Sequence, residues 1–278
     1  MINKKIGVKI GRLTNYADGL EKFPIRTWKK ELFHLNRLGI SVVEWSISNE
    51  GFYKNPIFDK KLNSDFNVYK SKYNLHISSI VFDFIIQTPF WKFTGSKRKI
   101  LEKKFYDCLE ACSKNNIKKI IFPIIDNSRF VENYEQKEVK SFFIKLEDYL
   151  ETSDLQILIE ADFNPEFFKN FISDLNNNYF KICYDTGNSS GNKFDIEKEF
   201  NFYGDYVSSI HIKDKNINNK SVLLGSGMLD FDKFFNLIND INYQGNFVFE
   251  TYKKKPLLKH LEYQLKLFKD KYNKFNLV

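Results

Sequence analysis

Residues 155–160, Leu-Gln-Ile-Leu-Ile-Glu, form a short apolar run that ends on a carboxylate. Residues 180–185, Phe-Lys-Ile-Cys-Tyr-Asp, have the same character, and the runs at 207–212 and 246–251 again carry an ionisable side chain near the end. Short runs rich in Ile, Val and Phe predict buried strands. The longer segments between them place apolar residues at helical spacing, so strands and helices are expected to alternate along the chain.

Eight strands of this kind are expected. They span residues 6–11, 40–46, 75–82, 118–124, 155–160, 180–185, 207–212 and 246–251. Eight strands alternating with helices are typical of a closed parallel barrel, whereas an open doubly wound sheet usually has fewer strands. Gly7 and Gly11 lack the third glycine of a dinucleotide-binding turn. We therefore predict an α/β fold, a (β/α)8 TIM barrel, with residues 1–278 forming one domain.

Composition restricts the classes of protein that remain. The chain has 278 residues, of which 42% are hydrophobic, enough to bury a large core. Three cysteines do not make a disulfide framework, so a reducing, cytoplasmic location is expected. Residues 1–5 are not followed by an apolar export segment. The apolar runs stay far below the roughly 18 residues of a membrane span, so no membrane association is expected.

The net charge is positive, because 43 lysines and arginines face 35 aspartates and glutamates. Such a field can attract phosphate groups or nucleic acid. The lysines are scattered along helical stretches, as at Lys266, Lys269 and Lys271, which favours a solvated face. No nucleic-acid partner is expected, and a homo-oligomer is left open.

Four successive strands end on residues that can bind a metal ion, namely Glu160, Asp185, His211 and Glu250. In a closed parallel barrel the carboxyl ends of the strands meet at one mouth, so these side chains should converge. Three carboxylates and one imidazole suit Mn²⁺, Mg²⁺ or Co²⁺, with Zn²⁺ as a further candidate. Buried together without a cation, the carboxylates would repel one another. One divalent metal ion is therefore predicted here.

Five motifs resemble those of the xylose isomerase-like TIM barrels, specifically the sugar phosphate isomerase/epimerase superfamily. They are Ile157-Leu-Ile-Glu160, Tyr184-Asp-Thr-Gly-Asn188, Ser209-Ile-His-Ile-Lys-Asp214, Leu224-Gly-Ser-Gly-Met-Leu-Asp230-Phe and Phe249-Glu-Thr251, in the order that the family has them. The resemblance implies that the four strand-end residues bind the metal and that Glu160 and Glu250 also act as the acid–base pair. It implies an isomerase or epimerase that removes a proton next to a sugar carbonyl and passes through an enediolate.

The same resemblance implies substrate-binding roles for several neighbours. Glu44, at the end of the second strand, would lie near the substrate, although a rim salt bridge explains it equally well. Lys213 follows the histidine as in the family, and Arg12 would meet a phosphate or hydroxyl group; either could instead be surface charge. The long loop at 84–96 contains Trp91, which would either close over the mouth as a lid and contact the substrate or pack against the rim.

Two positions depart from the ketose 3-epimerases of this superfamily. Those enzymes have histidine where this chain has Asn188 and arginine where it has Ile217. The amide of Asn188 can bond a substrate oxygen but brings neither a charge nor a transferable proton. Free-ketose 3-epimerase activity is therefore in doubt. Lys213 or Lys215 could supply the missing positive charge, which would suit a phosphorylated or carboxylated sugar.

Three other functions compete with this interpretation. A keto-inositol or keto-sugar dehydratase would use the same metal site and begin with the same proton abstraction. An endonuclease IV-like nuclease would need several more histidines than the four of this chain. A sugar-binding barrel without activity would not require all four predicted metal ligands.

Overall fold

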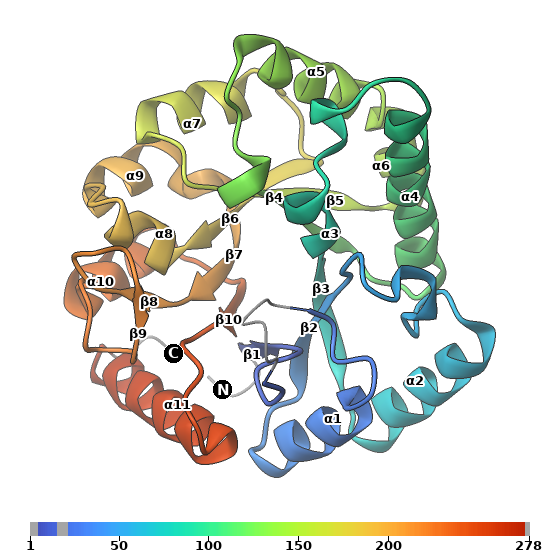
Figure 1. Ribbon diagram of the computed structural model, residues 1–278. Coiled ribbons are helices and arrows are strands. Elements are labelled where there is room, and N and C mark those ends of the chain that lie inside the picture. The colour runs from blue at the N-terminus through green and yellow to red at the C-terminus, as the bar shows by residue number, and fades with distance from the viewer. Residues whose placement is uncertain (1–4, 16–21, 276–278) are drawn as a thin grey trace.

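The computed structural model describes residues 5–15 and 22–275, and eight of its strands close into a parallel barrel (Figure 1). The order around the barrel is β1-β10-β7-β6-β5-β4-β3-β2. These strands are β1 (Ile6–Lys9), β2 (Val42–Ser46), β3 (His76–Val81), β4 (Lys119–Ile124), β5 (Gln156–Ala161), β6 (Phe180–Asp185), β7 (Val207–Ile212) and β10 (Asn246–Phe249). The predicted TIM barrel is confirmed.

All eight predicted strands are present, and β6 and β7 have the predicted bounds at both ends. β1 and β10 end earlier than expected, although the chain keeps contact with the barrel beyond them. The amide of Ile10 donates to the carbonyl of Glu44, and the amide of Glu250 donates to that of Ile212. Residue 250 is therefore held at the mouth even though it lies just past its strand.

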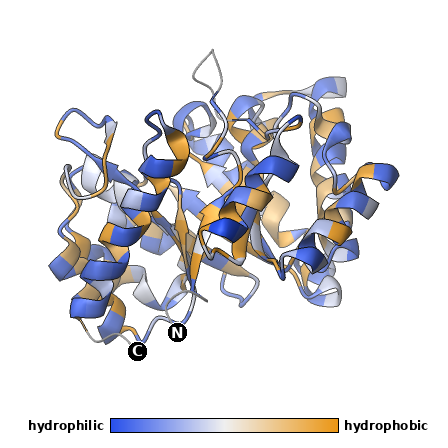
Figure 2. Ribbon diagram, turned by 90° about the horizontal axis from the view of Figure 1, so that it is seen from below, coloured by the Kyte–Doolittle hydropathy of each residue, from blue (hydrophilic) through white to orange (hydrophobic). Residues whose placement is uncertain are grey.

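Helices form a ring outside the barrel. The longer ones are α1 (Trp28–Arg37), α2 (Lys60–Lys72), α4 (Gly95–Lys114), α5 (Asn133–Ile144), α6 (Glu147–Ser153), α7 (Pro165–Ser173), α9 (Ile196–Tyr203), α10 (Phe231–Asp240) and α11 (Leu257–Lys274). Figure 2 shows the apolar strands at the centre and helices that alternate between polar and apolar faces. Each apolar face packs on the barrel, which is the burial that an amphipathic helix requires.

Short elements decorate the loops at both ends of the barrel. They are the helices α3 (Asp83–Gln87) and α8 (Thr186–Gly191), the 3-10 turns η2 (Phe52–Lys54), η3 (Phe90–Lys92), η4 (Asp126–Ser128) and η5 (Gly204–Tyr206), and the hairpin strands β8 (Asp214–Lys215) and β9 (Ser221–Val222). The antiparallel β8–β9 hairpin follows β7 and was not predicted. In Figure 1 it lies beside α8 near the mouth.

The interior of the barrel below the mouth is filled by side chains. Val81, Ile121, Leu158 and Cys183 form a buried cluster of their own, separate from the larger core between strands and helices. Side chains alternate across a strand, so Leu158 and Cys183 face the same way as Glu160 and Asp185, one layer deeper. The predicted site therefore lies on an apolar floor.

The loop at 84–96 packs against the rim, the second of the two expected arrangements. It forms α3 and η3, and Phe90 and Trp91 are both buried. The Trp91 ring stacks on Phe122, with centroids 5.7 Å apart. In this structure the indole is thus part of the aromatic core, and its contact with substrate stays a prediction. Aromatic burial explains the segment without a lid function.

None of the helices in the described part of the chain is long and apolar enough to cross a membrane. Residues 1–4, where an export signal would begin, lie outside that part.

Candidate metal centre

The four strand-end residues converge at the mouth of the barrel. Glu160, Asp185, His211 and Glu250, here called the quartet, each offer a ligand atom within 4.8 Å of the others'. All four are at most 6% exposed. The pairing of β6 with β7 sets Asp185 directly beside His211. Strand pairing therefore brings residues that are far apart in the sequence together in a buried space.

The imidazole of His211 presents its two nitrogens to different partners. Nδ1 faces the quartet, 3.2 Å from Glu250 Oε2, 3.6 Å from Glu160 Oε1 and 4.0 Å from Asp185 Oδ2. Nε2 lies 2.9 Å from Oε1 of Glu44, a fully buried residue of β2. The Glu44 carboxylate thus contacts the histidine and accepts a hydrogen bond from Ser79, while its predicted place near the substrate stays a prediction.

The quartet has the chemistry of a cation site. Among the described residues, neither ring nitrogen of His211 has a partner with full hydrogen-bond geometry, although the ring is completely buried. Buried polar atoms in native proteins usually have such a partner, so an unsatisfied imidazole calls for an explanation. A divalent cation beside Nδ1 would supply one and would offset the repulsion between the carboxylates. The donor set thus fits the predicted metal.

Two lysines contact Glu250. Lys9, at the end of β1, places its ammonium 2.7 Å from Glu250 Oε1 and 3.0 Å from Asp83 Oδ1. Lys213 lies 3.1 Å from both Glu250 Oε2 and Asp185 Oδ2. Lys9 is only 4% exposed, so its charge is held inside the barrel. The Lys213 ammonium contacts two of the quartet's carboxylates, and its role in substrate binding stays a prediction.

The surroundings of Glu160 and Glu250 shift their pKa values in opposite directions. Burial raises the pKa of Glu160, and His211 opposes that shift. Burial alone would raise the pKa of Glu250 too, but the Lys213 and Lys9 ammonium groups outweigh it and hold that pKa well below its usual range. Two carboxyl groups in one site with different proton affinities are suited to giving and taking protons.

Helix α8 places Asn188 beside the quartet. Asp185 caps this helix, because its Oδ1 accepts the Asn188 backbone N–H at 2.8 Å. The Asn188 side-chain Nδ2 lies 3.5 Å from Glu160 Oε1, and its Oδ1 accepts a 3.1 Å hydrogen bond from Lys215 Nζ. Since a lysine only donates, this bond assigns the amide oxygen to the lysine side and the NH₂ group to the Glu160 side.

Asp214 anchors the loop that follows the β8–β9 hairpin. Its carboxylate accepts the backbone N–H groups of Gly225 and Gly227 at 2.9 Å each, and that of Leu229 at 3.1 Å. The side chain is completely buried. Asp214 therefore supports the site through the backbone of this loop and does not itself reach the quartet.

Arg12 is buried beside the quartet. Its Nη1 donates to the carbonyl of Thr251, the residue after Glu250, at 3.2 Å. The side chain borders a small cavity that Lys9 and Asp83 also line. Arg12 is thus at the mouth, where a role in substrate binding remains a prediction.

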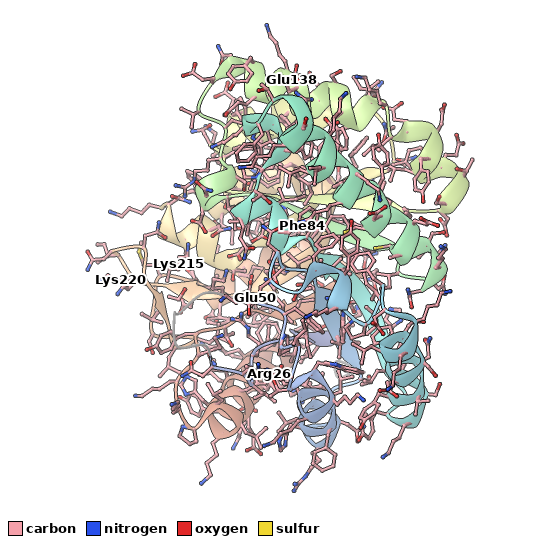
Figure 3. All side chains as sticks on the ribbon, turned by 45° about the vertical axis from the view of Figure 1, so that its right-hand side comes forward. Arg26, Glu50, Phe84, Glu138, Lys215 and Lys220 are labelled. Carbon is pink, nitrogen blue, oxygen red and sulfur yellow. The ribbon has the colours of Figure 1, made fainter. Side chains whose placement is uncertain are left out.

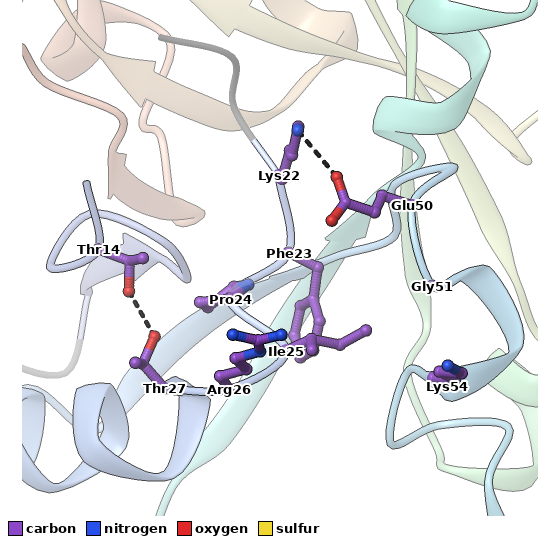
Figure 4. Close-up of a pocket in the computed structure, with 10 residues that line it drawn as sticks. All are labelled: Thr14, Lys22, Phe23, Pro24, Ile25, Arg26, Thr27, Glu50, Gly51 and Lys54. Carbon is purple, nitrogen blue, oxygen red and sulfur yellow. Dashed lines mark hydrogen bonds and ion pairs between the residues drawn. The ribbon is translucent and has the colours of Figure 1, made fainter. Parts of the chain in front are cut away.

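A larger pocket of about 630 Å³ lies at the rim, between the loops that follow β1 and β2 (Figure 4). Thr14 and Thr27 are hydrogen-bonded on one side of it, and the Lys22–Glu50 ion pair lies on the other. None of the residues that line it belongs to the quartet. The chemistry is therefore assigned to the barrel mouth.

The sequence profile of the xylose isomerase-like TIM barrel family matches residues 32–271. The chain belongs to this family. The family expected from the motifs is confirmed. A relative named putative L-ribulose-5-phosphate 3-epimerase SgbU, from Haemophilus influenzae, is 24% identical over 259 residues, which cover 85% of this chain and 88% of that protein.

Solved structures similar to this TIM barrel span nearly the whole chain. The xylose isomerase domain protein from Planctomyces limnophilus has a TM-score of 0.75 at 18% identity and covers 99% of both chains. A xylose isomerase-like TIM barrel protein from Mycobacterium smegmatis, solved in complex with magnesium, has a TM-score of 0.70 at 14% identity over 96% of this chain and 97% of that one. At these identities the likeness shows the fold.

Two residues of this family member's site were missed in the sequence. Lys9 and Asp83 lie on β1 and at the start of α3, far apart in the chain, and meet only when the barrel closes. A lone lysine in the apolar run 6–10 was the available signal. The other histidines, His34, His76 and His260, lie outside the quartet.

Proposed function

We propose that this chain is a divalent-metal-dependent epimerase or isomerase of keto sugars, with sugar phosphates as the substrate class to test first. The convergence of three carboxylates and one imidazole at the barrel mouth carries the proposal. The name of the Haemophilus influenzae relative supports epimerisation of a sugar phosphate, and the magnesium complex of the structural relative supports a metal.

The quartet would hold the cation, with Glu160 and Glu250 also serving as the acid–base pair. When bound, the cation acts as a Lewis acid on the substrate carbonyl and adjacent hydroxyl. One glutamate removes the proton from the neighbouring carbon, and the other returns one. Return to the opposite face of the same carbon gives an epimer, whereas return to the adjacent carbon gives an isomer.

The surrounding residues position the two glutamates and shape the space around them. Lys9 and Lys213 contact different oxygens of Glu250, which fixes the carboxylate in the mouth. The NH₂ group of Asn188 faces Glu160 and can donate to a substrate oxygen there. The apolar floor formed by Val81, Ile121, Leu158 and Cys183 keeps water from entering below. A positioned base in such a space typically contributes about 10²–10⁴-fold in rate.

Metal analysis and proton exchange test this function together. The purified protein should contain, or take up, Mn²⁺, Mg²⁺, Co²⁺ or Zn²⁺, and should exchange the α-proton of a pentulose 5-phosphate with solvent in D₂O. Glu250→Gln should reduce exchange by about 10²–10⁴-fold. Glu262→Gln, an exposed glutamate on α11, is the matched control and should leave exchange unchanged.

Absence of both metal uptake and exchange with keto sugars, keto sugar phosphates and inososes would overturn the proposal. Release of water with formation of an unsaturated product would instead assign the site to a dehydratase, since elimination begins with the same proton abstraction.

A further inference from the structure

Lys215 differs from the other two lysines that reach this site. Lys9 and Lys213 each contact two carboxylates. Lys215 has no ion pair within residues 5–15 and 22–275, and the one hydrogen bond of its ammonium group there is to the neutral amide oxygen of Asn188. It is half-buried, and burial lowers the pKa of its ammonium group, against the opposing field of Asp185. Among the described residues, Lys215 is thus a partly desolvated cation without a counter-charge in direct contact.

Helix α8 leaves space for the Lys215 side chain. A Cβ added at Gly191 would lie 2.7 Å from Lys215 Cδ and closer still to Asn219 Oδ1, so both side chains would have to move. Similarly, a Cβ at Gly187 would lie 2.8 Å from Lys213 Cγ. The two glycines are four residues apart and therefore lie on one face of the helix. Gly187 leaves room for Lys213, and Gly191 leaves room for Lys215 together with Asn219.

The backbone of Lys215 is fixed as well. Its carbonyl accepts the amide of Met228 at 2.9 Å, and the preceding residue, Asp214, holds the loop through Gly225 and Gly227. On β9 the partner of Lys215 is Ser221. The backbone of Lys220, in the same hairpin, is also held, by two hydrogen bonds with Asn216, but Lys220 is exposed whereas Lys215 is half-buried. Figure 3 shows both lysines on the same side of the molecule.

We infer that Lys215 binds an anionic substituent of the substrate, a phosphate or a carboxylate, at the edge of the mouth formed by α8 and the β8–β9 hairpin. An ammonium group has three donors, of which Asn188 uses one. Asn188 meanwhile presents its NH₂ group toward Glu160. The pair would hold a keto sugar at two points, its anionic group on Lys215 and an oxygen near the reacting carbon on Asn188. The inference rests on the proposed function.

Matched substrates and matched variants test this role. The probes are a pentulose 5-phosphate, a keto-uronate and the corresponding uncharged ketoses, and the variants are Lys215→Met and Lys220→Met. Loss of a charge-assisted hydrogen bond should lower kcat/KM for the preferred anionic substrate by about 10- to 100-fold, mainly through KM. The uncharged ketose should change little, and Lys220→Met should resemble the parent protein. Preference for the phosphate or the carboxylate identifies the anion.

Gly191→Ala provides an independent check on the path across α8. In an Asn219→Ala background, which removes the nearer contact with Asn219 Oδ1, it should reproduce the loss of discrimination and add little to Lys215→Met, because both then act on the same contact. An unchanged ratio of anionic to uncharged kcat/KM in Lys215→Met would overturn the inference, as would a parent protein that does not favour the anionic probe.

Calorimetric binding of the same probes separates this inference from the proposed function. Suppose that the anionic probe binds more weakly to Lys215→Met but not to Lys220→Met, and that no protein exchanges the substrate proton. This result would support the anion site and reject the epimerase. Proton exchange that requires Glu250 but is equally fast with charged and uncharged substrates would support the epimerase and reject the anion site. A parent protein that binds neither anionic probe would reject the role of Lys215.

Discussion

Oε1 of Glu44 lies 2.9 Å from Nε2 of His211, while Nδ1 of the same ring faces the other three members of the quartet. Ser79 Oγ donates to the second oxygen of Glu44 at 2.7 Å. A carboxylate beside one nitrogen of an imidazole favours the tautomer with its proton there and leaves the other nitrogen's lone pair for a metal. In this arrangement Glu44 orients His211 from within the barrel.

Glu44→Gln should therefore weaken metal binding without abolishing the fold. Replacing such a supporting group typically lowers metal affinity by about 10- to 100-fold. Competition with a fluorescent chelator measures the affinity, and thermal unfolding of the metal-free protein reports on the fold. Ser79→Ala, which removes only the contact to the second oxygen, should have a smaller effect. An affinity equal to that of the parent would show that Glu44 does not set the orientation of His211.

Lys9→Met should destabilise the protein, because it removes a buried ammonium from Asp83 and Glu250. Removing one partner of a buried ion pair typically costs about 3–5 kcal/mol of the free energy of unfolding. Urea unfolding measures this loss. The double variant Lys9→Met/Asp83→Asn should lose less than the sum of the single variants, since the two residues share a contact. Additive losses would mean that the pair is not coupled.

Asp214→Asn should loosen the loop at 223–229. The aspartate accepts three backbone N–H groups in a buried position, and an amide supplies only one oxygen to replace two. Losing such bonds to a charged acceptor should cost about 2–3 kcal/mol. Hydrogen exchange should report faster exchange at the amides of Gly225 and Gly227. Equal protection in both proteins would contradict the anchoring role.

His76 should make folding stability fall in mildly acidic solution. His76 is exposed at the start of β3, but partial desolvation of its ring, together with the ammonium groups of Lys70 and Lys119, lowers its pKa from 6.5. The unfolded chain therefore takes up the proton first as the pH falls below 6.5, and the free energy of unfolding decreases over the range between the unfolded and folded pKa values. Above that range the histidine is neutral in both states and has no such effect.

His76→Gln should reduce the loss of stability between about pH 7.5 and about pH 5.5, as urea unfolding at the two values would show. Lys70→Met removes one of the two positive neighbours and should reduce the loss in part. If the parent and His76→Gln lose the same free energy of unfolding, another group controls this range.

The barrel could be predicted because each strand carries its own signal. Runs such as residues 120–124 are apolar on both faces, as strands covered by helices must be, and the strand ends therefore fell close to their observed positions. The β8–β9 hairpin was missed because its strands have only two residues each, too few for any periodicity. The polar residues Asn216 and Asn219 at its turn were the remaining local signal.

The quartet could be predicted from the sequence because the carboxyl ends of the strands lie next to one another in a closed barrel. The contacts around it depend on side chains that cross between elements, and no local pattern encodes them. Lys9 is one such case, since it forms an ion pair with Asp83, which follows a different strand. Lys215 is another, because its reach depends on the absence of a side chain at Gly191.

The inner cluster of Val81, Ile121, Leu158 and Cys183 also blocks passage through the barrel from below. Burial raises the pKa of the Cys183 thiol to about 12, so this layer offers no ionised group to relay a proton. Substrate, metal and exchangeable protons must then all enter and leave by the upper opening. Whatever covers that opening, whether a bound sugar or a neighbouring loop, would interrupt all three exchanges at once.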